Sequence, residues 1–224
     1  MTRPLRHGQP WGQEAGGPPD LEVGGDDADL AQAAARQPDA LVRFRPSTQS
    51  DMARALGLSP DGTGTTEVAL DALTLQGLSE GDAMTAVNAV VVGRPPDQLR
   101  GTARSAPMTV IVDGRTWYQG PATSVVVASG QFLRGADLVP RGHPGDGWAE
   151  VQVYALTPRE RRTMRHRLAT GTHVPHPSIH ATRARTVEIE VAGRPLAVEV
   201  DGHDRARARR LRVTLAPAAI RILV

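Results

Sequence analysis

The stretch from Met108 to Tyr154 decides the fold of this chain, because it contains the clearest strand and turn signals. Its first part, Met108 to Ala128, reads M-T-V-I-V-D-G-R-T-W-Y-Q-G-P-A-T-S-V-V-V-A. Apolar and polar residues alternate on both sides of Asp113-Gly114, a dipeptide typical of two-residue β-hairpins. We predict a hairpin there, a third strand over Thr123 to Ala128 and a fourth over Trp148 to Tyr154.

A glycine- and proline-rich loop, Gly130 to Gly147, separates the last two of these strands. Loops of this length are uncommon inside compact domains and often carry function. Further along the chain, alternation predicts a hairpin between Val187–Val191 and Leu196–Val200, and two last strands over Leu211–Leu215 and Ala219–Val224. The second half is therefore expected to be antiparallel β-structure.

The composition is that of a soluble globular protein. The 224 residues allow one large domain or two small ones, and 3% aromatic residues imply a core of Val, Leu, Ala and Ile. The sequence has no apolar run long enough to span a bilayer and no apolar stretch of signal-peptide type, so we expect a cytoplasmic location. The absence of cysteine excludes disulfides and cysteine-based zinc sites.

The positive charge of this chain comes from arginine alone. The formal net charge is +2, the sequence pI is about 9.8, and there is no lysine. We interpret the arginine enrichment as the coding bias of a GC-rich genome. Because no basic face is interleaved with aromatic residues, we do not expect a nucleic-acid partner.

The N-terminal part begins with a segment that has no periodicity. Residues 1–20 are rich in Gly, Pro and Gln, and we expect a disordered tail there. A short strand over Leu21 to Val23 and a helix over Leu30 to Gln37 flank Gly24-Gly25-Asp26. A strand, a glycine-rich turn and a helix are the arrangement in which backbone N–H groups bind phosphate, although the same pattern is also an ordinary helix cap.

Further elements follow between this turn and the C-terminal strands. The pattern predicts a short helix capped by Ser50 or Asp51, a helix over Thr65 to Leu75 and a buried strand over Ala86 to Val92. A capping box with proline at the first helical position, Thr157 to Glu160, begins another helix. That helix carries clustered arginines, which face either solvent or an anionic lipid surface.

Taken in order, these segments resemble the catalytic domain of the diacylglycerol kinase family, which includes bacterial lipid kinases. The resemblance runs from Leu21 to the C-terminus. The matching segments are Gly24–Ala28 for G-G-D-G-T, Arg45–Arg54 for P-x-G-T-x-N-D-F-A-R, Ala128–Phe132 for A-N-G-x-Y/F, Val139–Gly147 for P-x-A-x-x-x-D-G, Arg167–His173 for a helix ending in x-G-x-H, and Asp201-Gly202-His203 for D-G-E.

The resemblance implies an α+β fold. Residues 21–80 form a reduced α/β nucleotide-binding-like part, and residues 86–224 form an antiparallel β-sandwich. The resemblance also implies ATP and magnesium as cofactors, a lipid or another small hydroxyl compound as substrate, and peripheral contact with a membrane. The oligomeric state is left open.

The family motifs also imply site residues, without assigning any metal ligand. At the acceptor hydroxyl, the implied catalytic residues are Asp201 and His203. The residues implied to bind the cofactor are Gly24, Gly25, Asp26, Thr48 and Asp51.

Several positions depart from the family pattern. Asp27 replaces a glycine and is expected to add a carboxylate beside the phosphate, Ala28 replaces a threonine, and His203 replaces an acidic residue. We also expect the β-α-β unit that precedes the glycine-rich loop in the family to be absent. These departures favour a degenerate member, a pseudokinase that binds lipid, nucleotide or a partner. The alternatives are an active ATP-dependent lipid kinase and a free-standing β-sandwich interaction module.

Three closely spaced histidines raise the question of a metal site. His173, His176 and His180 alternate with prolines, which turn the side chains in different directions in an extended segment. We therefore do not predict a metal site. The resemblance gives His173 the role of a loop anchor.

Overall fold

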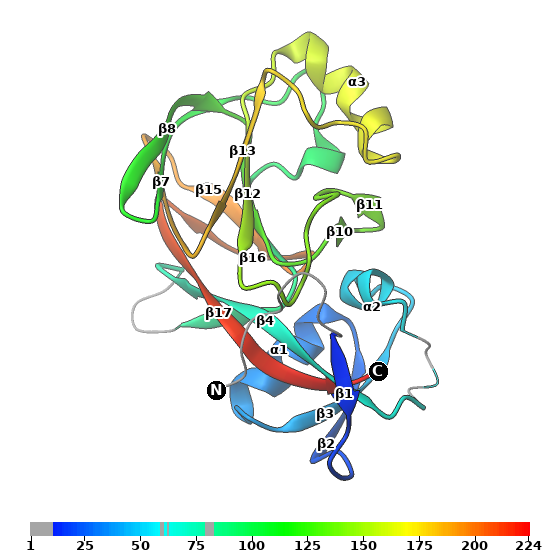
Figure 1. The fold of residues 1–224 in the computed structure, drawn as a ribbon. Coiled ribbons are helices and arrows are strands. Elements are labelled where there is room, and N and C mark those ends of the chain that lie inside the picture. The colour runs from blue at the N-terminus through cyan, green and yellow to red at the C-terminus, as the bar shows by residue number, and fades with distance from the viewer. Residues whose placement is uncertain (1–10, 59–60, 62, 79–82) are drawn as a thin grey trace.

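The computed structural model describes residues 11–58, 61, 63–78 and 83–224. The chain forms a small α/β part, at the bottom of Figure 1, and a larger β-sandwich above it. The predicted fold class is confirmed. The first ten residues of the predicted tail, and residues 59–60, 62 and 79–80 of the predicted N-terminal part, lie outside the described residues.

The α/β part is a short parallel unit. Strand β2 (Leu21–Gly25) leads into helix α1 (Asp27–Arg36), and β3 (Leu41–Pro46) returns parallel to β2 before helix α2 (Asp51–Leu56). Its core buries apolar side chains of both helices against the sheet. Ser50 caps α2 and Gly57 ends it in the left-handed conformation, so the predicted caps are confirmed.

The expected disorder through residue 20 is wrong for one segment. Strand β1 (Gly12–Glu14) pairs antiparallel with β4 (Thr66–Gln76), with Gly12 opposite Val68. The contact is close, because a Cβ atom on Gly12 would lie 2.2 Å from the Thr66 side chain. Composition alone misses such a strand, because its stability comes from the neighbouring edge and not from its own residues.

The helix predicted over residues 65–75 is wrong, because this segment is strand β4. Val68, Leu70 and Ala72 pack into the α/β core, whereas Leu73 and Leu75 pack into the sandwich core. A strand buried on both faces loses the polar alternation that identifies strands, so its apolar residues also fit a helical face. The segment forms a strand because it pairs along its length with β17 (Arg210–Leu223).

The sandwich consists of two sheets. The larger has the order β1-β4-β17-β14-β7-β8, with β2, β3 and β5 attached, and the other has the order β13-β12-β9-β6-β15-β16. The remaining elements are β5 (Met84–Ala86), β6 (Ala89–Gly93), η1 (Pro96–Gln98), β7 (Ala106–Val112), β8 (Arg115–Ala122), β9 (Ser124–Ala128), β10 (Phe132–Leu133), β11 (Ala136–Asp137), β12 (Ala149–Tyr154), α3 (Pro158–Leu168), β13 (Ile179–Ala184), β14 (Thr186–Val191), β15 (Leu196–Val200), β16 (His203–Ala208) and β17 (Arg210–Leu223).

Two strand pairings differ from the sequence-based expectation. The hairpin at Asp113-Gly114 is confirmed as β7–β8, but β14 and β15 do not form a hairpin. They belong to different sheets, and Ala192 to Pro195 cross from one layer to the other. Alternation predicts that a segment is a strand but does not identify its partner.

The last two predicted strands are one long strand, β17, drawn in red in Figure 1. Its pairing with β4 shifts register between Ala216 and Ile220. Its first half pairs with β14 of the sandwich, and its end runs parallel to β3 of the α/β part. This strand and β4 therefore join the two parts into one structure, which argues against a free-standing sandwich.

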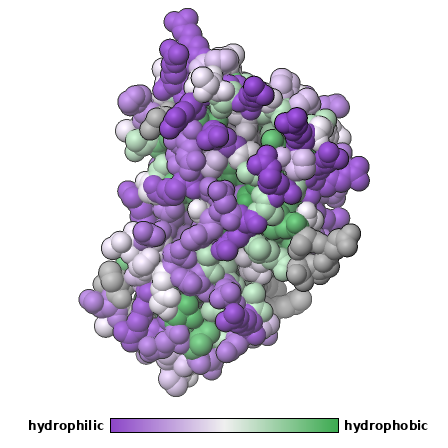
Figure 2. Space-filling view, turned by 180° about the vertical axis from the view of Figure 1, so that it is seen from behind, coloured by the Kyte–Doolittle hydropathy of each residue, from purple (hydrophilic) through white to green (hydrophobic). Residues whose placement is uncertain are grey.

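Most of the surface in Figure 2 is hydrophilic, with small apolar areas between polar ones. Within the described ranges, no helix has the length and apolar character needed to cross a membrane.

Candidate functional site

A cavity of about 520 Å³ lies where the two parts meet. It is enclosed by the start of α1, the segment leading into α2, the β10–β11 turn and the β15–β16 turn. Five of the residues predicted from the motifs line it, although they come from both ends of the chain: Asp26, Thr48, Asp51, Asp201 and His203. Gly24 and Gly25 end β2 immediately before α1, next to this cavity.

The N-terminus of α1 is closed by its own carboxylates. Asp26 Oδ1 accepts hydrogen bonds from the backbone N–H groups of Ala28 (2.9 Å) and Asp29 (3.3 Å). Asp29 Oδ2 accepts one from the N–H of Asp26 (3.0 Å), which completes a capping box. Gly25 has φ 128°, and a Cβ atom there would lie 1.9 Å from Asp29 Oδ2. The N–H groups of Asp26, Ala28 and Asp29 at the helix start are therefore bonded within the chain.

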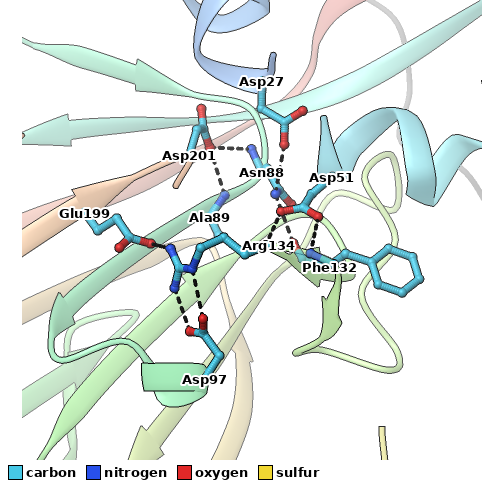
Figure 3. Close-up of polar contacts among 10 residues, drawn as sticks. Asp27, Asp51, Asn88, Ala89, Asp97, Phe132, Arg134, Glu199 and Asp201 are labelled. Carbon is cyan, nitrogen blue, oxygen red and sulfur yellow. Dashed lines mark hydrogen bonds and ion pairs between the residues drawn. The ribbon is translucent and has the colours of Figure 1, made fainter. Parts of the chain in front are cut away.

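We had expected the Asp27 carboxylate to lie beside the phosphate. The residue lines the cavity, but it is buried and its carboxylate bonds to groups of the protein interior. It accepts hydrogen bonds from Ser50 Oγ (2.5 Å), Met52 N (3.1 Å) and Asn88 Nδ2 (3.0 Å). Burial raises its pKa to about 7; the bond from Ser50 opposes this rise, and the nearby Asp201 carboxylate adds to it. Asp27 thus connects α1, α2 and the β5–β6 connection. Figure 3 shows its bond to Asn88.

Asp201, predicted to be catalytic, holds a turn in place. Its carboxylate accepts hydrogen bonds from the backbone N–H groups of Val87 (2.9 Å), Asn88 (3.0 Å) and Ala89 (3.0 Å). Burial raises the pKa of Asp201 to about 6, although these bonds act in the opposite direction. Figure 3 shows this carboxylate directed at the start of β6. Both oxygens are occupied by structural contacts, and the result is a fixed position for the following His203.

His203 joins the two parts across the cavity. Its Nε2 lies 2.8 Å from Asp26 Oδ2, and about half of its side chain is exposed. Burial raises the pKa of Asp26, but the hydrogen bonds from His203 and from the backbone of α1 outweigh this effect and hold the pKa below its usual value. The two predicted site residues are therefore partners of each other.

Arg134 is a cavity residue that sequence reasoning missed. Its guanidinium bonds Asp97 (Nε 2.9 Å, Nη2 2.6 Å) and also Glu199, while its backbone N–H bonds Asp51. Asp51 also accepts a bond from the N–H of Gly135 (2.7 Å). Arg134 is therefore paired with two carboxylates, as Figure 3 shows. Its partners lie 37 and 65 residues away, so no local motif marks them.

The cavity does not fit ATP and magnesium well. Asp26, Asp27, Asp51 and Asp201 each already accept hydrogen bonds from the protein. In the part of the chain that the structure describes, no three His, Asp or Glu side chains are arranged to hold a metal ion. An anion in the cavity would also lie near the carboxylates of Asp26, Asp51 and Asp201. Of the two arginines there, Arg134 is already paired with two carboxylates.

The three closely spaced histidines have separate environments. The His173 ring is buried and stacks on Tyr154, and its Nε2 lies 2.9 Å from the Leu138 carbonyl oxygen. His176 Nδ1 accepts a hydrogen bond from the backbone of Ser178, and His180 packs on Tyr118. The position of His173 agrees with the expected role of a loop anchor.

This two-part fold, with a cavity between an α/β unit and a β-sandwich, defines a kinase-like class. Residues 98–224 match the family model of the YegS C-terminal NAD kinase beta sandwich-like domain. Because this match covers more than half of the chain, the chain belongs to that family, and the resemblance found in the motifs is confirmed.

Solved structures agree with this fold. A diacylglycerol kinase from Bacillus anthracis str. Sterne is 18% identical with a TM-score of 0.72, and the match covers 91% of this chain and 76% of that chain. A putative diacylglycerol kinase from the same organism is 16% identical with a TM-score of 0.73, covering 91% and 77%. Yeast NADH kinase complexed with NADH is 11% identical with a TM-score of 0.55, covering 92% and 61%. No curated protein matches the chain in sequence.

Proposed function

We propose that this chain is a non-catalytic member of its family, a lipid-kinase-like pseudokinase. It uses the cavity to bind a lipid head group or a protein partner, without transferring phosphate. The capping box at the start of α1 is the observation that carries this proposal, because Asp26 and Asp29 occupy the N–H groups that a phosphate would need.

Two further contacts support the proposal. Phosphoryl transfer depends on neutralising the charge that develops on the phosphate oxygens. Arg134, a cation in the cavity, is already neutralised by Asp97 and Glu199. Both oxygens of Asp201 already accept hydrogen bonds from backbone N–H groups, whereas a general base has to accept a proton from the acceptor hydroxyl.

The direct test is an assay with purified protein, labelled ATP, Mg²⁺ and vesicles that contain diacylglycerol. We expect no transfer above the level without protein, and no change in melting temperature with ATP. Transfer that Asp26→Ala abolishes would show that the chain is an active kinase.

A second experiment tests the role of the capping box. Asp29→Ala frees the N–H of Asp26 and the space above Gly25. We expect ADP to raise the melting temperature of this variant but not that of the wild type. Glu14→Ala, which removes one exposed negative charge from strand β1, is the matched control. Equal responses of all three proteins to ADP would contradict the proposed effect of the capping box.

An active ATP-dependent lipid kinase is the second candidate. The convergence of Asp26, Thr48, Asp51 and His203 on one cavity favours it, because these residues were predicted from separate motifs.

We also propose peripheral contact with a membrane. The α3 basic surface consists of exposed arginines that have no ion-pair partner among the described residues: Arg100, Arg104, Arg159, Arg162 and Arg167. Arg161 fastens the 100–105 segment to α3, because its Nη2 donates to Ser105 Oγ at 2.7 Å. Each basic side chain near an anionic bilayer contributes about 1 kcal/mol. We therefore expect co-sedimentation with phosphatidylserine vesicles, weakened by Arg159→Gln/Arg162→Gln and not observed with phosphatidylcholine.

A further inference from the structure

A second cavity lies away from the cleft, on the outer face of the six-stranded sheet. It is a groove of about 790 Å³ that shares no lining residue with the cleft. Strands β12 and β13 form its floor, and the segments 139–141 and 174–177 form its walls. Its size is typical of a small-molecule site.

The floor of the groove changes from apolar to charged along its length. In the antiparallel register, Tyr154 lies opposite Ile179, Gln152 opposite Ala181 and Glu150 opposite Arg183. At the Ile179 end, the wall residues Val174 and Pro175 are apolar.

Gln152 provides a hydrogen-bond donor in the middle of the floor. Its side chain is 3% exposed, and the Tyr154 hydroxyl donates to its Oε1 at 2.6 Å. That bond fixes the amide, while its NH₂ group has no hydrogen-bond partner among the described residues. The amide nitrogen is not among the buried atoms that lack a partner, so it is accessible from the groove. A ligand carboxylate would replace its bond to water with a stronger, charge-assisted bond.

The charges in the groove favour a single negative charge on the ligand. Arg183 is already paired with Glu150 (2.6 Å) and Asp146 (3.4 Å). Arg141, from the loop, is exposed and has no ion-pair partner in the described ranges. One unpaired cation and one neutral donor match a carboxylate better than a doubly charged phosphate.

We propose that this groove binds an amphiphile with an acyl chain and a carboxylate head. The apolar end accepts the chain, and the Gln152 amide and Arg141 bind the carboxylate. This binding does not depend on phosphate transfer or on the cleft.

The test titrates the full chain with decanoate, below its micelle concentration, by calorimetry. Gln152→Glu keeps the acceptor for Tyr154 and replaces the NH₂ donor with a negatively charged oxygen, so we expect at least tenfold weaker binding. Gln119→Glu makes the same change at an exposed position on β8 in the other sheet, and we expect unchanged affinity. Decan-1-ol and decylamine, which lack the carboxylate, are expected to bind at least tenfold more weakly.

Nuclear magnetic resonance of the Gln152 side-chain amide supplies a second readout. We expect its NH₂ signals to move on addition of decanoate. The proposal is wrong if these signals do not move, if decan-1-ol binds as tightly as decanoate, or if Gln152→Glu binds like the wild type. If Gln152→Glu does not fold, Arg141→Gln replaces it; this exposed loop variant is expected to lose about fivefold in affinity, and an unchanged affinity contradicts the proposal.

Discussion

The chain makes the same tight turn twice, at Asp113-Gly114 and at Asp201-Gly202, with different consequences. The aspartate has φ 47° in both turns, and the glycines have φ 80° and 81°. Asp113 is exposed, and its Oδ1 accepts hydrogen bonds from the N–H groups of Arg185 (3.0 Å) and Thr186 (2.8 Å). Asp201 is buried and accepts three. The dipeptide determines the local conformation, whereas the surroundings of the carboxylate determine its role.

The largest difference in stability between the two turns is expected when each aspartate is replaced by alanine. Asp201→Ala leaves three buried N–H groups without an acceptor, at about 1–3 kcal/mol each, so we expect a loss of about 3–6 kcal/mol of unfolding free energy. Asp113→Ala leaves the N–H groups of Arg185 and Thr186 free to bond water, so we expect a loss of about 1 kcal/mol of unfolding free energy. Urea denaturation of both variants measures the difference. Equal losses would contradict the distinction between the two turns.

Stability is expected to fall as the pH rises from 5 to 8. The pKa values of Asp27 and Asp201 are raised to about 7 and about 6 in the folded chain, above the ordinary value of about 3.9 for an unfolded chain. Their protonated forms therefore contribute stability that is complete below about pH 4 and is lost toward pH 7, and the contribution of these two groups changes by about 2–4 kcal/mol between pH 5 and 8. Asp71, whose pKa burial also raises to about 6, adds to this loss. Asp27→Asn is expected to flatten this dependence, measured by urea midpoints across the range. Parallel curves for the two proteins would show that Asp27 does not cause it.

Substituting the turn glycines is expected to give two similar and moderate losses. A Cβ atom on Gly114 or Gly202 would meet no heavy atom within 4 Å, so only the backbone conformation opposes alanine. We expect Gly114→Ala and Gly202→Ala to lower the melting temperature by similar amounts, equivalent to about 1–2 kcal/mol each. A much larger loss at Gly202 would mean that the backbone there is constrained by more than the turn.

The smallest change in unfolding free energy is expected at the contact between His203 and Asp26. His203 directly follows the Asp201-Gly202 turn. The His203–Asp26 pair is partly exposed, and such pairs typically contribute about 0–1 kcal/mol. We therefore expect His203→Gln to change the unfolding free energy by less than about 1 kcal/mol in urea denaturation. A larger loss would show that this contact holds the two parts together.

The sequence predicted the turns and helix caps well, because these depend on neighbouring residues. Asp113-Gly114, the Ser50 cap and the Thr157 capping box are examples. Strand β4 was misassigned because it is buried on both faces, and the partners of β14 and β15 were misassigned because alternation carries no information on pairing.

The family motifs named residues that the fold brings to one cavity, but they gave no information on the hydrogen bonds that these residues make. The family motifs identified Asp26, Thr48, Asp51 and His203, which the fold brings together. They did not identify Asn88, whose Nδ2 bonds both Asp27 and the Phe132 carbonyl oxygen, or Arg134 with its two acidic partners. These contacts join segments that are distant in the sequence, and a buried polar residue has no signature in a single sequence.

The long strand β17 affects when the N-terminal part can fold during synthesis. Strand β3, near residue 41, runs parallel to β17 residues 221–223. At about 5–20 residues per second, on the order of ten seconds or more of translation separate these segments. During that interval the nascent α/β part lacks a strand that its sheet requires, and its apolar edge is exposed to chaperones. Folding of the N-terminal part is therefore expected to wait until β17 has been synthesised.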